Sequence, residues 1–148
     1  MKARSLVASK RGERGAALLE AAVTIPIILL ICVGIFEFGR AYQTWQVLTN
    51  AAREGARMAI IQGSADADIT ARVRSYMHDG QLPNYGSARV TITRNVPLTG
   101  TDTGSKVEID YPFQFVVLNP VVRLVVPSDS TTGRAITMMS SATMRNES

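Results

Sequence analysis

The feature that most constrains this chain is its longest uncharged run. Sixteen consecutive residues between Glu20 and Glu37, AAVTIPIILLICVGIF, carry no charge. The uncharged stretch 16–19 extends this run to about the 20 residues that a membrane-spanning helix requires. We therefore expect a transmembrane helix over residues 16–38, preceded by a short leader (1–15) and followed by an exposed domain (39–148).

The positive charge of the chain is concentrated before this run. The chain has a formal net charge of +4. Residues 1–15 contain five basic residues and one acid, so this segment alone carries +4. After Gly15, eleven basic residues and eleven acids cancel one another. Basic residues beside an apolar segment stay in the cytoplasm. The sequence therefore predicts a single-pass protein of the bacterial inner (cytoplasmic) membrane, with a cytoplasmic N-terminus and a C-terminal domain outside the cytoplasm. The balanced remainder gives no reason to expect nucleic acid as a partner.

The single cysteine limits how the exposed domain is stabilised. Cys32 lies inside the apolar run, so no intrachain disulfide can form. A lipid attachment at Cys32 would normally need a small residue before it, and Ile31 is bulky, so we reject that reading.

The helix is expected to continue beyond the membrane. After Glu37 the sequence has no proline until position 83, and apolar residues recur at steps of three and four. These residues are Ala41, Trp45, Leu48, Ala52, Ala56 and Ala59. We predict one helix from about Ala16 to Gln62, roughly 70 Å long at 1.5 Å per residue, that ends before Gly63.

The remaining sequence predicts a short helix and about three strands. Residues 66–78 have the spacing of an amphipathic helix, whereas 88–96, 106–117 and 134–145 are rich in β-branched or aromatic residues. The first two strands should form a hairpin, and Pro112 argues that the second lies at a sheet edge or contains a bulge. The apolar segment 118–126 is too short to span a membrane and should form one or two helical turns. The predicted fold is α+β and pilin-like, with a long N-terminal helix on an antiparallel sheet of about three strands.

Residues that could carry catalysis are few. The one histidine, His78, has no second histidine or cysteine nearby to form a metal site, and the nucleotide-binding, hydrolase and metalloprotease motifs are absent from the sequence. We therefore predict no enzymatic activity, no catalytic residues, no metal, no cofactor and no small-molecule substrate.

The most specific local pattern lies where the leader meets the apolar run. Gly15 is followed by four apolar residues and then by Glu20, an acid that is costly inside a membrane unless it has a partner or stays near the headgroups. This pattern resembles the cleavage region of type IV prepilins of the Flp, or tight-adherence, class. The stretches FEFGRAY (36–42) and LTNAAREGAR (48–57) are similar to the TadE-like family of minor pilins, as are Tyr111-Pro112-Phe113 and the closing ATMR (142–145). The residue after the glutamate is Ala21, where Flp-class sites commonly carry tyrosine.

The resemblance implies a role for three residues. A prepilin peptidase would cut between Gly15 and Ala16, and Glu20 would attract the new amine of a neighbouring subunit. The implied partners are that peptidase, other pilin or pseudopilin subunits, the Tad inner-membrane assembly platform and the lipid bilayer. The implied function is that of a minor pilin, or pseudopilin, acting as a structural or assembly component of a tight-adherence pilus.

Three alternatives remain open from the sequence. An uncleaved single-pass anchor with a periplasmic interaction domain would have the same sequence features, but Gly15 and Glu20 would then be incidental. A secreted binding protein cut near Gly34 would lose the apolar half of its helix. A periplasmic enzyme would need catalytic groups that the sequence does not provide.

Overall fold

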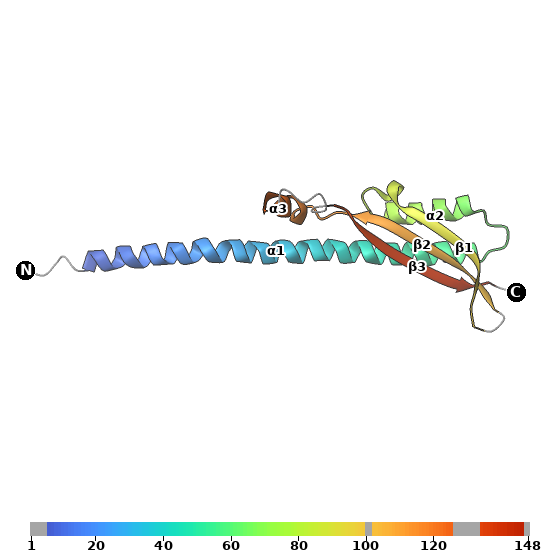
Figure 1. Ribbon diagram of the computed structural model, residues 1–148, viewed down its shortest axis with the longest axis horizontal. Coiled ribbons are helices and arrows are strands. Elements are labelled where there is room, and N and C mark those ends of the chain that lie inside the picture. The colour runs from blue at the N-terminus through green and yellow to red at the C-terminus, as the bar shows by residue number, and fades with distance from the viewer. Residues whose placement is uncertain (1–5, 100–101, 126–133, 147–148) are drawn as a thin grey trace, which may run out of the picture.

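The structure is a computed structural model that describes residues 6–99, 102–125 and 134–146. Its elements follow the order α1 (Leu6–Ala59), α2 (Asp66–Asp79), the 3-10 turn η1 (Tyr85–Ser87), β1 (Arg89–Pro97), β2 (Thr103–Phe113), α3 (Leu118–Val125) and β3 (Ile136–Arg145). Figure 1 shows α1 as a long rod with α2 and the sheet gathered around its C-terminal half. This confirms the predicted α+β, pilin-like fold.

Helix α1 differs from the prediction at both ends. It begins at Leu6 and not at Ala16, so it runs unbroken through Gly15 and through Pro26. No proline precedes Pro26, and one glycine costs a helix only about 1 kcal/mol relative to alanine, so the leader boundary does not interrupt the helix. The C-terminal end comes three residues early, at Ala59, and Gly63 lies in the turn that follows with a φ of +84°.

The sheet is antiparallel with the order β1-β2-β3, so β2 is the central strand. The strand of Pro112 is therefore not an edge strand, but Pro112 itself has the edge position that was expected there. Pairing between β1 and β2 begins at Arg89 and Asp110, so Pro112 has a partner only on the β3 side, where it faces Thr137. The irregularity occurs instead in β1, where one extra residue lies between Thr93 and Val96.

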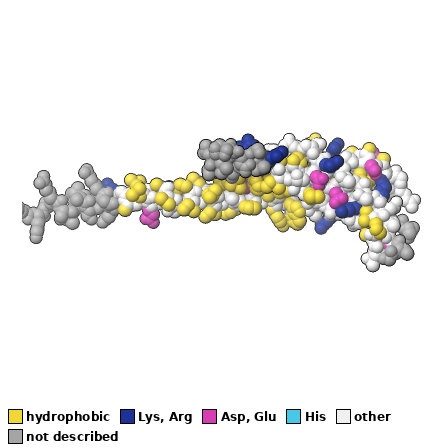
Figure 2. Space-filling model, viewed as in Figure 1, with side chains coloured by type: hydrophobic (Ala, Val, Ile, Leu, Met, Phe, Trp, Pro, Cys, Tyr) yellow, Lys and Arg dark blue, Asp and Glu magenta, His cyan; other side chains and the backbone are white. Residues whose placement is uncertain are grey.

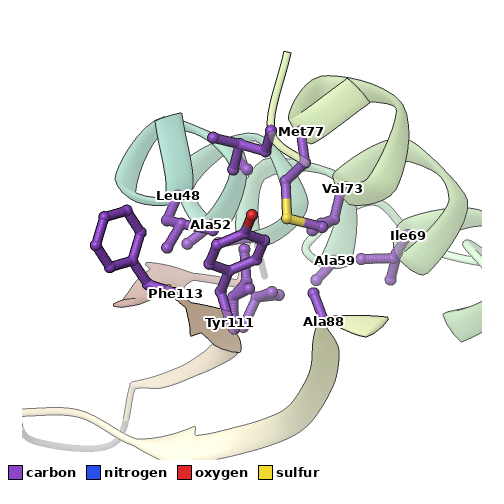
Figure 3. Close-up of a cluster of buried hydrophobic side chains, with 14 residues drawn as sticks. Leu48, Ala52, Ala59, Ile69, Val73, Met77, Ala88, Tyr111 and Phe113 are labelled. Atoms are coloured by element: carbon purple, nitrogen blue, oxygen red, sulfur yellow. The ribbon is translucent and has the colours of Figure 1, made fainter. Parts of the chain in front are cut away.

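One face of the sheet packs on α1 and α2. Alternate residues of β2 point to the core, as predicted, and their neighbours face the other side. Figure 3 shows this core, and its buried members are Leu48, Ala51, Ala52, Ala56, Ala59, Ile69, Val73, Met77, Leu82, Ala88, Val107, Ile109, Tyr111 and Phe113. Burial raises the pKa of Tyr111, whose hydroxyl donates a hydrogen bond to the Pro83 carbonyl.

Helix α3 stands apart from the other elements of the domain. It lies alongside α1, closer to the N-terminus of the rod than the sheet does (Figure 1). Its eight residues confirm the prediction of one or two helical turns in this segment. α3 therefore lies where the bare part of α1 meets the folded domain.

Candidate functional site

The N-terminal part of α1 is an apolar shaft with almost no contacts from the rest of the chain. We use the term shaft for residues 14–36. Nearly all of its side chains are exposed, Leu19 by 73% and Leu30 by 58%. Figure 2 shows this part of the rod covered mainly by hydrophobic side chains. Within the described part of the chain, the helical stretch Arg14–Ala59 alone is long and apolar enough to cross a membrane.

The residues predicted to take part in processing and assembly lie on the first turns of the shaft. Gly15, Ala16 and Glu20 are all exposed and all belong to α1. A side chain added at Gly15 would meet no atom within 4 Å outside its own part of the helix. Ala16 and Glu20 are four residues apart, so they lie on the same side of the helix one turn from each other. The folded domain does not reach any of the three.

At the other end of the shaft, Glu37 forms a site that the sequence analysis did not identify. Its side chain is fully buried although it carries a carboxylate. Oε1 accepts hydrogen bonds from the backbone N–H groups of Val117 and Leu118, where α3 begins. These are among the N–H groups that a helix leaves without an internal acceptor, and a negative charge is favourable at that end. Glu37 therefore caps α3 from a different helix.

Arg40 completes this junction. Its Nη1 donates to Glu37 Oε2 at 2.9 Å, and its guanidinium carbon lies 5.5 Å from the centre of the Phe113 ring. A cation over an aromatic face is attracted to the ring, so Arg40 connects α1 to the end of β2 as well. Glu37, Arg40 and Phe113 thus hold the central strand and α3 against the helix at one level.

The sequence contained a signal for this junction. A glutamate that ends an apolar run and is followed three residues later by arginine can form an ion pair on one helix face. What the sequence could not provide was the third partner, because Val117 is eighty positions away and its contribution is a backbone N–H.

The described residues contain few groups that could bind a metal ion or take part in catalysis. Among them, no group of three His, Cys, Asp or Glu side chains lies close enough to hold a metal ion. His78 is exposed at the end of α2, 3.3 Å from Asp79 and edge-on to the Tyr85 ring. An open groove of about 750 Å³ between α1 and α2 is lined by side chains that include Gln43, Gln46 and Arg72.

Comparison with known proteins matches the helix that carries these features. Residues 15–57 match the family model described as TadE-like protein. Over this stretch the chain is TadE-like. The likeness implies a protein associated with Tad pili and with the cell envelope. No curated protein and no solved structure matches the chain.

The extent of the TadE-like match is informative. It begins at Gly15 and ends at Arg57, so it includes Glu20, Glu37 and Arg40. It covers the shaft and most of the packed half of α1, and it does not extend to the strand residues 111–113 and 142–145. The residues that match the TadE-like family model thus lie on α1, and the strands lie outside the match.

Proposed function

We propose that this chain is a TadE-like minor pilin, or pseudopilin, that serves as a structural or assembly component of a tight-adherence (Flp) type IV pilus. The observation that carries the proposal is the family match over the exposed apolar shaft and the adjoining helix. An apolar surface of this length needs lipid or other helices around it. In the membrane the shaft spans the bilayer, and in a pilus it packs against the shafts of other subunits.

Processing is tested by the N-terminal sequence of the protein taken from native membranes. A start at Ala16 supports cleavage by a prepilin peptidase, and Gly15→Val should then leave the full-length precursor, because a peptidase needs close access to the backbone. Gly15→Ala is the matched control with a smaller side chain. Cleavage of Gly15→Val at the wild-type rate would show that the site is elsewhere.

An uncleaved anchor with an exposed interaction domain is the second candidate. It is favoured by the continuity of α1 through Gly15, because a peptide bond inside a regular helix is less accessible to a peptidase than one in an extended segment. A protein that starts at Met1 in native membranes supports this candidate. A start after Gly34 would contradict both and would indicate a secreted protein.

Glu20 is proposed to act in assembly. It is exposed on the shaft and lies one turn from Ala16, where cleavage would create an amine. A single subunit in lipid gains nothing from this carboxylate, but a neighbouring subunit could supply the positive charge that offsets its cost.

Glu20→Ala should therefore leave protein level and membrane insertion near normal, while pilus number and co-purification with other pilus subunits fall. Glu20→Asp, which retains the charge on a shorter side chain, should restore part of the pilus number. Normal piliation by Glu20→Ala would reduce Glu20 to a residue that favours the start of the membrane segment.

A further inference from the structure

Exposed aromatic side chains cluster just beyond the shaft. Phe38, Tyr42 and Trp45 are 68%, 60% and 49% exposed, although each is large and largely apolar. At 100° per residue, the three lie within about 60° of one another around α1. Tyr42 and Trp45 contact each other with ring centres 6.1 Å apart. The described part of the chain therefore leaves an aromatic strip of α1 uncovered just beyond the shaft.

The position of this strip along α1 matches the outer edge of a bilayer. If Glu20 stays at the cytoplasmic headgroups, the hydrocarbon layer begins at Ala21 and about 20 residues later ends near Arg40. Phe38 then lies at the end of that layer, and Trp45 lies about 7 Å beyond its edge at 1.5 Å per residue. This is the headgroup region, where tyrosine and tryptophan side chains gather in membrane proteins.

The charges at this level do not contradict contact with lipid. Glu37 is fully buried, and its two oxygens accept hydrogen bonds from Val117, Leu118 and Arg40. Arg40 is itself partly covered by its contact with the Phe113 ring. The junction thus satisfies its charged groups internally, and the aromatic strip beside it is exposed.

Helix α3 lies on another side of α1 and extends from the level of Glu37 toward the N-terminus of the rod (Figure 1). Glu37 holds its first turn, and its sequence, LNPVVRLV, is apolar except for Asn119 and Arg123. Val116, two residues before the start of α3, is 58% exposed. Amphipathic helices lie at the boundary between headgroups and acyl chains, with their apolar face toward the acyl chains.

We propose that Phe38, Tyr42, Trp45 and α3 form a collar that lies where the acyl chains meet the headgroups of the outer leaflet and fixes the depth at which the domain stands on the membrane. This inference rests on the membrane-spanning shaft of the proposed function. The collar gives the domain a surface that contacts lipid. Glu37 is the residue that fixes α3 within the collar.

Trp45 is the only tryptophan in the chain, so its fluorescence reports on the collar directly. The full-length protein is reconstituted in vesicles of phosphatidylethanolamine and phosphatidylglycerol that carry a nitroxide at the headgroup, high on the acyl chain or near the chain end. Trp45 should lose most of its emission to the headgroup nitroxide and little to the one at the chain end. Moving the tryptophan, with Trp45→Phe and Val116→Trp, should give the same order of quenching.

A mid-shaft probe separates failure of the collar from failure of the membrane span. With Trp45→Phe and Leu30→Trp, emission should be lost mainly to the chain-end nitroxide. If that signal is absent, the shaft does not span the bilayer, and the proposed function fails together with the collar. If it is present but Trp45 is quenched only by aqueous acrylamide, the span stands and the collar is wrong. Shielding of Trp45 from both acrylamide and lipid nitroxides would mean that protein covers the strip, which also overturns the collar.

Discussion

The two halves of α1 reverse the usual relation between side-chain size and burial. In the shaft, leucine, isoleucine and valine side chains are exposed, whereas the apolar side chains buried in the second half are alanines apart from Leu48. Large apolar residues are normally the most buried. The two halves differ because the second half has its partner within the chain and the shaft does not.

The second half shows what a partner within the chain requires. Ala51, Ala52, Ala56 and Ala59 allow the backbone of α1 to approach the sheet and α2 closely, and Gly55 lies against Val73 and Val107. The sheet and α2 supply the larger side chains of the core. The large side chains of the shaft have no partner in the described part of this domain. Lipid and the shafts of other subunits are surroundings in which such side chains would be covered.

The sharpest test of this comparison uses the same substitution in both halves. Leu48 is fully buried and Leu30 is 58% exposed. Leu48→Ala should lower the free energy of unfolding of the domain by about 3 kcal/mol, because it removes packed methyl groups and leaves a cavity. Leu30→Ala should leave it unchanged. Amide hydrogen exchange in β2, measured on the full-length protein in detergent micelles, reports this free energy. Equal losses for the two variants would mean that the shaft folds back on the domain.

Two of the glutamates of α1, Glu37 and Glu20, provide the next test. Glu37→Ala leaves Val117 and Leu118 without their acceptor and Arg40 without its counter-charge, which should cost about 2 kcal/mol, since Arg40 is partly exposed to solvent. The loss should be concentrated at α3, where the amide protons of Val117 and Leu118 should exchange faster.

Two further variants interpret the Glu37 result. Glu37→Gln retains an acceptor oxygen and loses only the charge, so it should lose less than Glu37→Ala. Glu20→Ala should leave exchange at α3 unchanged, because Glu20 is exposed on the shaft and makes none of the contacts that hold α3. Unaltered exchange in Glu37→Ala would show that the connection to α3 is not maintained in solution.

Local periodicity was sufficient to predict most of the fold. The apolar spacing predicted the long helix and the helix at Asp66–Asp79, and alternation in β2 predicted which of its residues are buried. The strand order was not available from those patterns. Pro112 reads as an edge signal, and it is tolerated in the central strand because β1 stops pairing at Asp110.

The candidate site could be predicted only in part. Gly15, Ala16 and Glu20 form a pattern within six residues, so the sequence alone identifies them, although their roles remain predictions. The junction at Glu37 depends on backbone N–H groups from a distant segment of the chain. The spacing of apolar residues around Glu37 does not indicate these groups. Contacts of this kind require the fold before they can be found.

The smallest expected effect is that of replacing a glycine by alanine in the second half of α1. Whether the free energy of unfolding rises or falls tests how closely this half is packed. Replacing glycine by alanine inside a helix normally stabilises it by about 1 kcal/mol, because alanine loses less backbone entropy on folding. At Gly34 an added Cβ meets no atom within 4 Å, so Gly34→Ala should not destabilise the domain. At Gly55 the same Cβ would lie 2.6 Å from a methyl group of Val73 and 3.2 Å from one of Val107, and both belong to the core.

Gly55→Ala therefore sets the gain in helix propensity against the cost of overpacking, which is about 1–3 kcal/mol where neighbours cannot move freely. Val73 and Val107 are fully buried, so the cost should exceed the gain and leave a net loss of about 1 kcal/mol in the free energy of unfolding. Exchange of the β2 amide protons in Gly55→Ala and Gly34→Ala, compared under identical micelle conditions, measures the difference. A domain stabilised by Gly55→Ala would mean that α1 stands farther from Val73 than the structure has it, and the small residues of the second half would then need a reason other than close approach.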